Sequence, residues 1–288
     1  MNRSWLAMVP AVATLWCAPR AAAQTFALDE NRPNVLWAEI QRPTFRGDQY
    51  LSAWLGFVGV RYQFASQLSV LAGLPFAQAE VTAHDAGGTA VPGTTSTALG
   101  NPYLGLRFGL PWQTVAVDVV VGVRMGQARY ASYGYSYSGN WLAAVQGDWD
   151  RFEAFGRSEY WSGRVAALLS RHLSESLSLH LRAGAAFVEG KGLPLEAAAA
   201  TTYRQERLVA SAGVTYRTRN LEYAFAPRGS GGPGPIQLAL GLGYTTGRTT
   251  PTVFVRVPLR GSTPYDPLAR YVVGVSATLL LGGPHGGF

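Results

Sequence analysis

The 288-residue sequence contains one cysteine, Cys17, and one lysine, Lys191. Cys17 lies in an N-terminal segment that we expect to be removed, so the mature chain has no thiol. That excludes a disulfide framework and thiolate catalysis. The other basic residues are arginines scattered singly, without a basic run or a recognition motif. We therefore expect no nucleic-acid partner.

The apolar run near the start, residues 5–16, is shorter than the roughly 20 residues that a membrane-spanning helix needs. Arg3 precedes the run and Ala21-Ala22-Ala23 follows it, an order typical of a secretory signal peptide. We expect residues 1–23 to be the signal peptide and residues 24–288 to form one domain. Removal of Arg3 and Arg20 lowers the formal net charge from +7 by two, to +5.

The sequence shows no His, Asp or Glu cluster with metal-ligand spacing and no phosphate-binding loop, so we expect no metal and no cofactor. Its only His-x-Ser spacing, His172 and Ser174, would bring a base and a nucleophile to one strand face. This pair falls in a predicted turn, and no segment like that of outer-membrane phospholipase A accompanies it. An outer-membrane lipid hydrolase is therefore the third interpretation, and we expect no enzyme.

Alternation with a period of two is the dominant pattern. In residues 114–125, valines and a methionine share one face, while Asp118, Gly122 and Arg124 share the other. Residues 177–187, 236–244 and 271–281 repeat this pattern, which predicts strands. Their polar faces hold Gly, Ser, Thr, Ala and single arginines rather than the Lys, Glu and Asp of a soluble β-sandwich, which is the alternative fold. The fold class predicted is all-β, a transmembrane antiparallel β-barrel with lipid-facing apolar sides.

About twelve strands are predicted, at residues 35–41, 50–63, 68–80, 103–110, 115–125, 164–170, 177–188, 207–217, 221–226, 236–244, 252–259 and 271–281. Residues 82–101 and the segment from Lys191 through residues 197–200 are predicted loops. Residues 127–163 are predicted as a long extracellular loop, with an extra hairpin, and so fourteen strands, as the alternative. Short turns follow every second strand, which places both chain ends on the periplasmic side.

The inward parity predicts which charged side chains line the lumen: Glu39, Arg107, Asp118, Arg124, His180, Arg182 and Arg256. Buried charges of this kind form either a closed structural ladder or a water-filled constriction whose positive excess favours anions. Aromatic residues near strand ends predict girdles at the membrane interfaces, namely Phe76, Trp112, Phe187, Tyr216, Tyr244 and Tyr271.

Residues 99–108, LGNPYLGLRF, resemble a strand motif of outer-membrane proteins grouped as transporters of the phenol-degradation meta pathway. The match covers about ten residues and carries no catalytic or binding residue. The resemblance implies a barrel associated with uptake of small hydrophobic compounds.

These patterns predict a barrel in the outer membrane of a Gram-negative bacterium, where it allows passive passage of small solutes, hydrophobic, aromatic or anionic. The alternative is a structural or surface-interaction barrel with a plugged lumen. The expected partners are outer-membrane lipid and lipopolysaccharide, the barrel-assembly machinery and small-molecule solutes.

Overall fold

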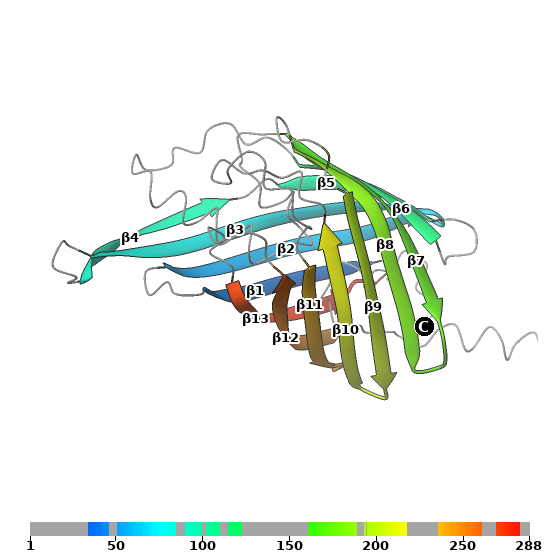
Figure 1. The fold of residues 1–288 in the computed structure, drawn as a ribbon. Coiled ribbons are helices and arrows are strands. Elements are labelled where there is room, and N and C mark those ends of the chain that lie inside the picture. Colours follow the sequence, from blue (N-terminus) through cyan, green and yellow to red (C-terminus); the bar gives the residue numbers. More distant parts are fainter. Residues whose placement is uncertain are drawn as a thin grey trace, which may run out of the picture.

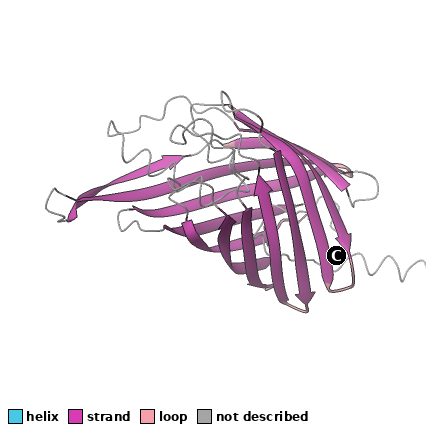
Figure 2. Ribbon diagram, in the orientation of Figure 1, coloured by secondary structure: helices cyan, strands magenta, loops and turns pink. Residues whose placement is uncertain are grey.

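A computed structural model describes thirteen strands and their short turns. The described residues are 34–45, 51–84, 90–99, 102–109, 115–122, 161–188, 193, 195–217, 236–260 and 269–282. The strands are β1 (Val35–Phe45), β2 (Leu51–Ala65), β3 (Leu68–His84), β4 (Ala90–Leu99), β5 (Tyr103–Gly109), β6 (Val115–Gly122), β7 (Ser162–His172), β8 (Leu177–Val188), β9 (Leu195–Gln205), β10 (Leu208–Arg217), β11 (Ile236–Tyr244), β12 (Thr249–Arg260) and β13 (Ala269–Leu280). Figure 2 shows strands and short loops throughout the described part. Within that part, no helix is long and apolar enough to cross a membrane.

The strands close into an antiparallel barrel (Figure 1). From β5 to β13 each strand pairs with its neighbour in sequence, and β13 pairs with β1 from Val35–Leu280 to Phe45–Ala269. β2 then pairs with both β1 and β3, which completes the ring. Every strand of the ring therefore has a paired neighbour on both sides, as a barrel in a bilayer requires.

The ring has twelve strand positions because β4 and β5 share one edge of β3. β5 pairs with the first part of β3, from Leu68 to Gly73, and β4 pairs with the last part, from Phe76 to His84. In Figure 1 the β3–β4 hairpin extends well beyond the neighbouring strands. The predicted twelve-stranded antiparallel barrel is confirmed, with β4 as an additional strand.

Two predicted loops are strands. Residues 82–101 include β4, and the alanine run 197–200 lies in the middle of β9, which pairs with β8 and β10 along its length. These predictions were wrong because neither segment shows apolar alternation: β4 is rich in Thr and Ser, and β9 carries alanine on both faces.

The predicted strand at residues 221–226 lies outside the described residues. Because β10 pairs directly with β11, that segment is not a strand of the wall between them. β9 is the eighth strand of the ring, a place that was predicted for residues 207–217. The short turn after the eighth strand is therefore at Glu206 and Arg207, between β9 and β10, rather than at residues 218–220. In the same way β6 pairs directly with β7, so no hairpin from residues 127–163 enters the wall, and the fourteen-stranded alternative does not hold. The segment 123–160 lies outside the described residues.

The short turns that the structure describes, after β2, β7, β9 and β11, lie at one end of the barrel. In the turn after β9, Glu206 adopts a φ of 50°, and in the turn after β11 Gly247 adopts 57°. The start of β1 and the end of β13 meet at this end, where the Leu281 N–H donates to the Asn34 carbonyl at 3.0 Å. Short turns and chain ends mark the periplasmic side of bacterial barrels, and we refer to it as the short-turn end.

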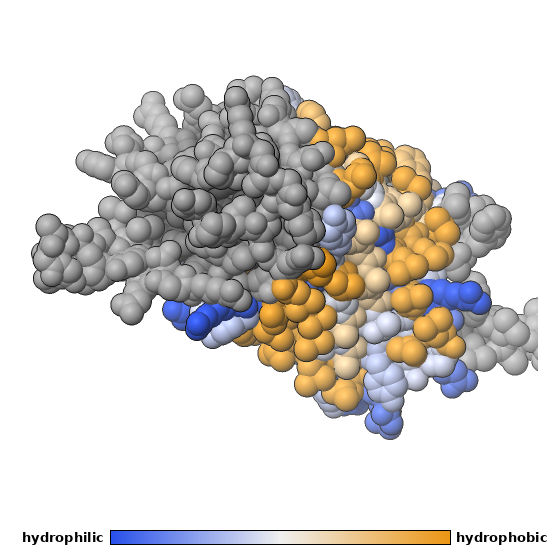
Figure 3. All heavy atoms as spheres, in the orientation of Figure 1, coloured by the Kyte–Doolittle hydropathy of each residue, from blue (hydrophilic) through white to orange (hydrophobic). Residues whose placement is uncertain are grey.

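The two faces of the wall differ in composition. Outward side chains in the middle of the strands are exposed and apolar, as Val119 at 39%, Val165 at 54% and Val275 at 54% show. In Figure 3, orange hydrophobic atoms cover much of the described outer surface and blue atoms gather toward the strand ends. Exposed apolar area of this extent on a closed barrel matches a lipid-facing surface.

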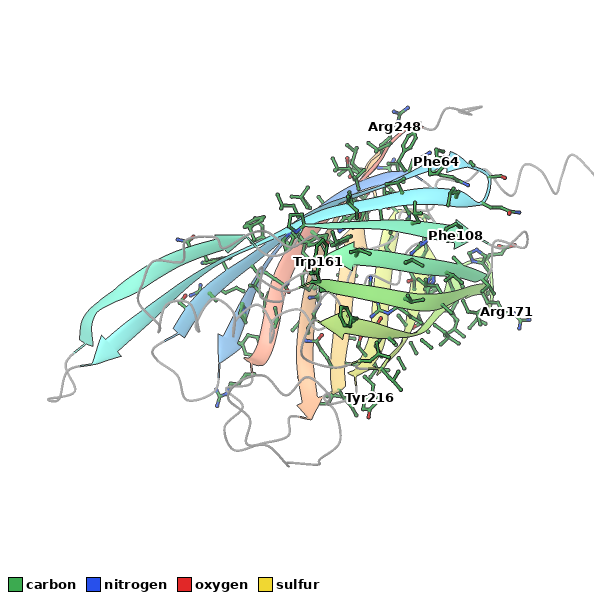
Figure 4. All side chains as sticks on the ribbon, turned by 90° about the horizontal axis from the view of Figure 1, so that it is seen from above. Phe64, Phe108, Trp161, Arg171, Tyr216 and Arg248 are labelled. Carbon is green, nitrogen blue, oxygen red and sulfur yellow. The ribbon has the colours of Figure 1, made fainter. Side chains whose placement is uncertain are left out.

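Aromatic side chains lie on the outer surface at both ends of the strands. At the short-turn end they are Phe64, Phe108, Tyr203 and Tyr244; toward the other end they are Trp161, Phe187, Tyr216 and Tyr271. Figure 4 shows Phe64, Phe108, Arg171 and Arg248 toward the same end. Of the predicted girdle residues, Phe76, Phe187, Tyr216, Tyr244 and Tyr271 are exposed, and Trp112 lies outside the described residues. The spacing of the two sets matches interfacial girdles.

Candidate functional site in the barrel interior

The seven charged residues assigned to the lumen fall into three groups. Five have buried side chains, with exposures of 1 to 6%: Glu39, Arg107, His180, Arg182 and Arg256. Asp118 lies opposite Arg107 in the β5–β6 ladder, and its side chain is not described. Arg124 lies outside the described residues. Because the outer face is apolar and exposed, the five buried side chains belong to the inner face.

One cluster joins β12 to β1. Arg256 donates from Nη1 to Gln41 Oε1 at 2.9 Å and from Nη2 to Glu39 Oε1 at 3.2 Å. Its guanidinium also lies over the Phe254 ring, 4.8 Å from the centroid. Barrel closure makes this cluster possible, since Arg256 and Glu39 are 217 residues apart in sequence.

A second cluster joins β7, β8 and β9. The carboxylate of Glu196 lies 3.4 Å from Arg182 Nε and 3.8 Å from Arg164 Nε. All three side chains are at least nine-tenths buried. Sequence reasoning missed Glu196 because it lay in a predicted loop, and the inward parity of residues 164–170 would have identified Arg164.

The two clusters lie on opposite walls of the barrel. In the ring, five strands separate β1 from β8 in either direction. Two further buried arginines, Arg61 on β2 and Arg107 on β5, lie on the strands between them. Charged groups therefore face the interior from several sides.

Two serine–histidine pairs lie on the β7–β8 hairpin. In the buried pair, Ser170 Oγ and His180 Nδ1 are 3.0 Å apart; in the exposed pair, Ser178 Oγ and His172 Nδ1 are 2.8 Å apart. Both are direct cross-strand neighbours. The serine bonded to His172 is thus Ser178, whereas Ser174 Oγ accepts from the Leu177 N–H. Repetition with the residues exchanged between strands is typical of structural cross-strand pairing.

Aromatic rings cover one part of the inner wall. Trp37 stacks on Phe57 with centroids 5.9 Å apart, and Phe57 stacks on Tyr103 at 5.6 Å. A Cβ built on Gly73 would lie 2.6 Å from both Phe57 and Tyr103, so glycine there leaves space for the rings. This glycine therefore permits close aromatic packing on the inner wall.

Small side chains cover the facing part of the wall. Ala198 and Ala200 of β9 and Ala239 of β11 form a buried cluster, and Ser211 of β10 lies between these strands. Bulky rings on β1, β2 and β5 and small residues on β9 to β11 make the interior asymmetric.

No family model matches the sequence, and no curated protein matches it. Solved structures of outer-membrane proteins resemble the fold, and two of them align with most of this chain. An outer membrane channel from Pseudomonas putida F1 aligns with a TM-score of 0.58 at 12% identity, covering 91% of this chain and all of that chain. The NanC porin aligns with a TM-score of 0.51 at 10% identity, covering 85% of this chain and all of that chain. The likeness shows the fold alone, a closed antiparallel β-barrel.

The interior offers hydrogen bonds, positive charge and aromatic surface. Within the described ranges, no three His, Cys, Asp or Glu side chains come together as a metal site. The arrangement can bind or repel charged solutes.

Proposed function

We propose that this barrel is an outer-membrane channel for passive passage of small solutes and that its interior favours anions. The observation that supports this is the charge of the inner face. Five arginines, Arg61, Arg107, Arg164, Arg182 and Arg256, are buried there in the described part, against two glutamates, Glu39 and Glu196. Asp118 adds one acid by register. The remaining positive charge attracts anions into a wet pore.

The aromatic wall extends the proposal to planar solutes. Trp37, Phe57 and Tyr103 present ring surface beside the Arg256 cluster, and such surface attracts apolar and aromatic compounds. This agrees with the resemblance of residues 99–108 to transporters of the phenol-degradation meta pathway. The channel and porin with similar folds support a passage role in the same general way.

The competing function is a plugged barrel with a structural or surface-interaction role. It is favoured by the tightness of the ion pairs, since the side chains of Glu196 and Arg182 are 0% and 1% exposed. In that case the arginines form a closed ladder, and the barrel conducts little.

Planar-bilayer recording distinguishes the two functions. The purified barrel should conduct, and its reversal potential in a salt gradient should indicate anion preference. Exchange of Arg182 for Glu, alone and together with Arg124→Glu, should shift the reversal potential toward cation preference. Absence of conductance in the native barrel contradicts the channel, and an ion preference that ignores both exchanges contradicts the assignment of the lumen.

A further inference from the structure

The outer wall carries a groove at the short-turn end of β10 to β13. Its volume is about 290 Å³. Apolar side chains that face outward form most of its lining: Leu208, Leu242, Tyr244, Val253 and Val275. All five are exposed, so the groove opens on the surface that faces lipid rather than on the interior.

The groove lies beside Pro251, where the pairing of β11 with β12 ends. The β11–β12 ladder ends at Gly243 and Thr252, and the next residue of β12 is Pro251, which has no N–H to donate. On the outer face Pro251 carries only its compact ring, so a depression remains between the larger apolar side chains of the neighbouring strands.

Positive charge borders the groove at the membrane edge. Arg207 directly precedes Leu208, and Arg248 lies in the turn between β11 and β12; both are exposed. Backbone bonds join these turns to the grooved strands, since the Thr245 N–H donates to the Arg207 carbonyl at 2.8 Å and the Leu280 N–H donates to the Arg248 carbonyl at 2.9 Å. Glu206 is the single acid in these two turns, so the local charge is positive.

We propose that this groove binds one acyl chain of a glycerophospholipid, with the phosphate of the headgroup at Arg207 and Arg248. The proposal rests on the membrane location proposed above. The volume is below the roughly 300–1,000 Å³ of pockets for compact drug-sized ligands, and the open, apolar shape suits a segment of one chain. Tyr244 lies where the chain meets the headgroup, the position that an amphipathic ring prefers.

The acyl-chain part is tested on the purified full-length barrel. After delipidation in detergent, phosphatidylglycerol is added and retained lipid is counted by native mass spectrometry. The native barrel should retain one lipid. Val275→Trp fills the groove and should weaken retention about tenfold. Val273→Trp changes the preceding outward position of the same strand, outside the groove lining, and should retain the lipid.

The headgroup part uses a second matched pair. Arg207→Gln should weaken retention, while Arg171→Gln, an exposed outward arginine at the same end on β7, should not. Diacylglycerol, which lacks the phosphate, should be retained less than phosphatidylglycerol. Equal retention by Val275→Trp and Val273→Trp overturns the site, as does a native barrel that retains no lipid. Dimers that Val275→Trp dissociates would make a second copy the occupant and overturn it as well.

Heat-modifiable migration on a gel shows that each variant is folded. A folded barrel that fails in membrane fractionation contradicts the membrane location, whereas a membrane-inserted barrel without the lipid adduct contradicts the groove alone. Neither membrane fractionation nor lipid retention depends on whether the barrel conducts, so both are separate from the test of the channel function.

Discussion

Val119 is an outward residue at which a single substitution tests whether the outer face of the barrel contacts lipid. It lies in the middle of β6, is 39% exposed and has the exposed residues Leu106 and Val165 as ladder neighbours. Val119→Arg should destabilise the barrel folded in lipid by about 2–4 kcal/mol, because the charge would lie near the bilayer midplane. Leu173→Arg, in a short turn, should cost about 0–1 kcal/mol. Denaturant titration of the barrel in lipid vesicles measures both, and equal costs would contradict the assignment of the lipid-facing surface.

Glu196 is the residue on which the second interior cluster depends. Glu196→Gln leaves Arg164 and Arg182 buried without their carboxylate, and breaking a buried pair in this way costs about 3–5 kcal/mol. The same titration measures the loss. Glu175→Gln, on an exposed turn, is the control and should change stability by less than about 0.5 kcal/mol. If the two changes cost the same, water in the interior compensates the arginines, which favours an open pore over a closed ladder.

At the scale of the element, turn geometry limits substitution. Gly247 has φ +57° with no atom near its missing Cβ, so only the backbone conformation opposes a side chain there. Gly247→Ala should destabilise the barrel by about 1 kcal/mol. Gly282→Ala, where there is also open space and no positive φ, should be close to neutral. Thermal unfolding followed by gel migration compares them, and a neutral Gly247→Ala would mean that the turn relaxes.

Strands differ in how clearly the alternation of their sequence predicts them. In β13 the outward residues Tyr271, Val273 and Val275 alternate with buried ones, and the period of two is unmistakable. In β9 the inward Ala198 and Ala200 are flanked by further alanines, so the two faces have the same composition. Neighbouring strands determine that β9 is a strand, because they pair with it on both sides.

At the scale of the whole molecule, a closed barrel with an apolar outer face should be found in the outer membrane. Fractionation of a Gram-negative host should recover the chain there without residues 1–23, and unboiled samples should migrate differently from boiled ones on a gel. Recovery as a soluble periplasmic monomer would contradict the membrane location. Retention of the leader in the membrane fraction would contradict only the signal peptide, which stays a prediction.

The predicted number of strands was right through two compensating errors. β9 was interpreted as a loop, and residues 221–226 were counted as a strand. The total of twelve was unchanged because one strand was missed and another was added. The additional strand β4 could not be predicted, since it depends on the free edge that the long strand β3 offers beyond β5.

The sequence by itself determined which face of a strand each residue occupies, because alternation is a local property of extended chain. Glu39, Arg107, His180, Arg182 and Arg256 could therefore be assigned to the inner side before any partner was known. Only the tertiary structure decided what these residues contact. Glu39 meets Arg256 because closure places β1 beside β13, and Arg182 meets Glu196 because strand register, which no single strand encodes, aligns β8 with β9.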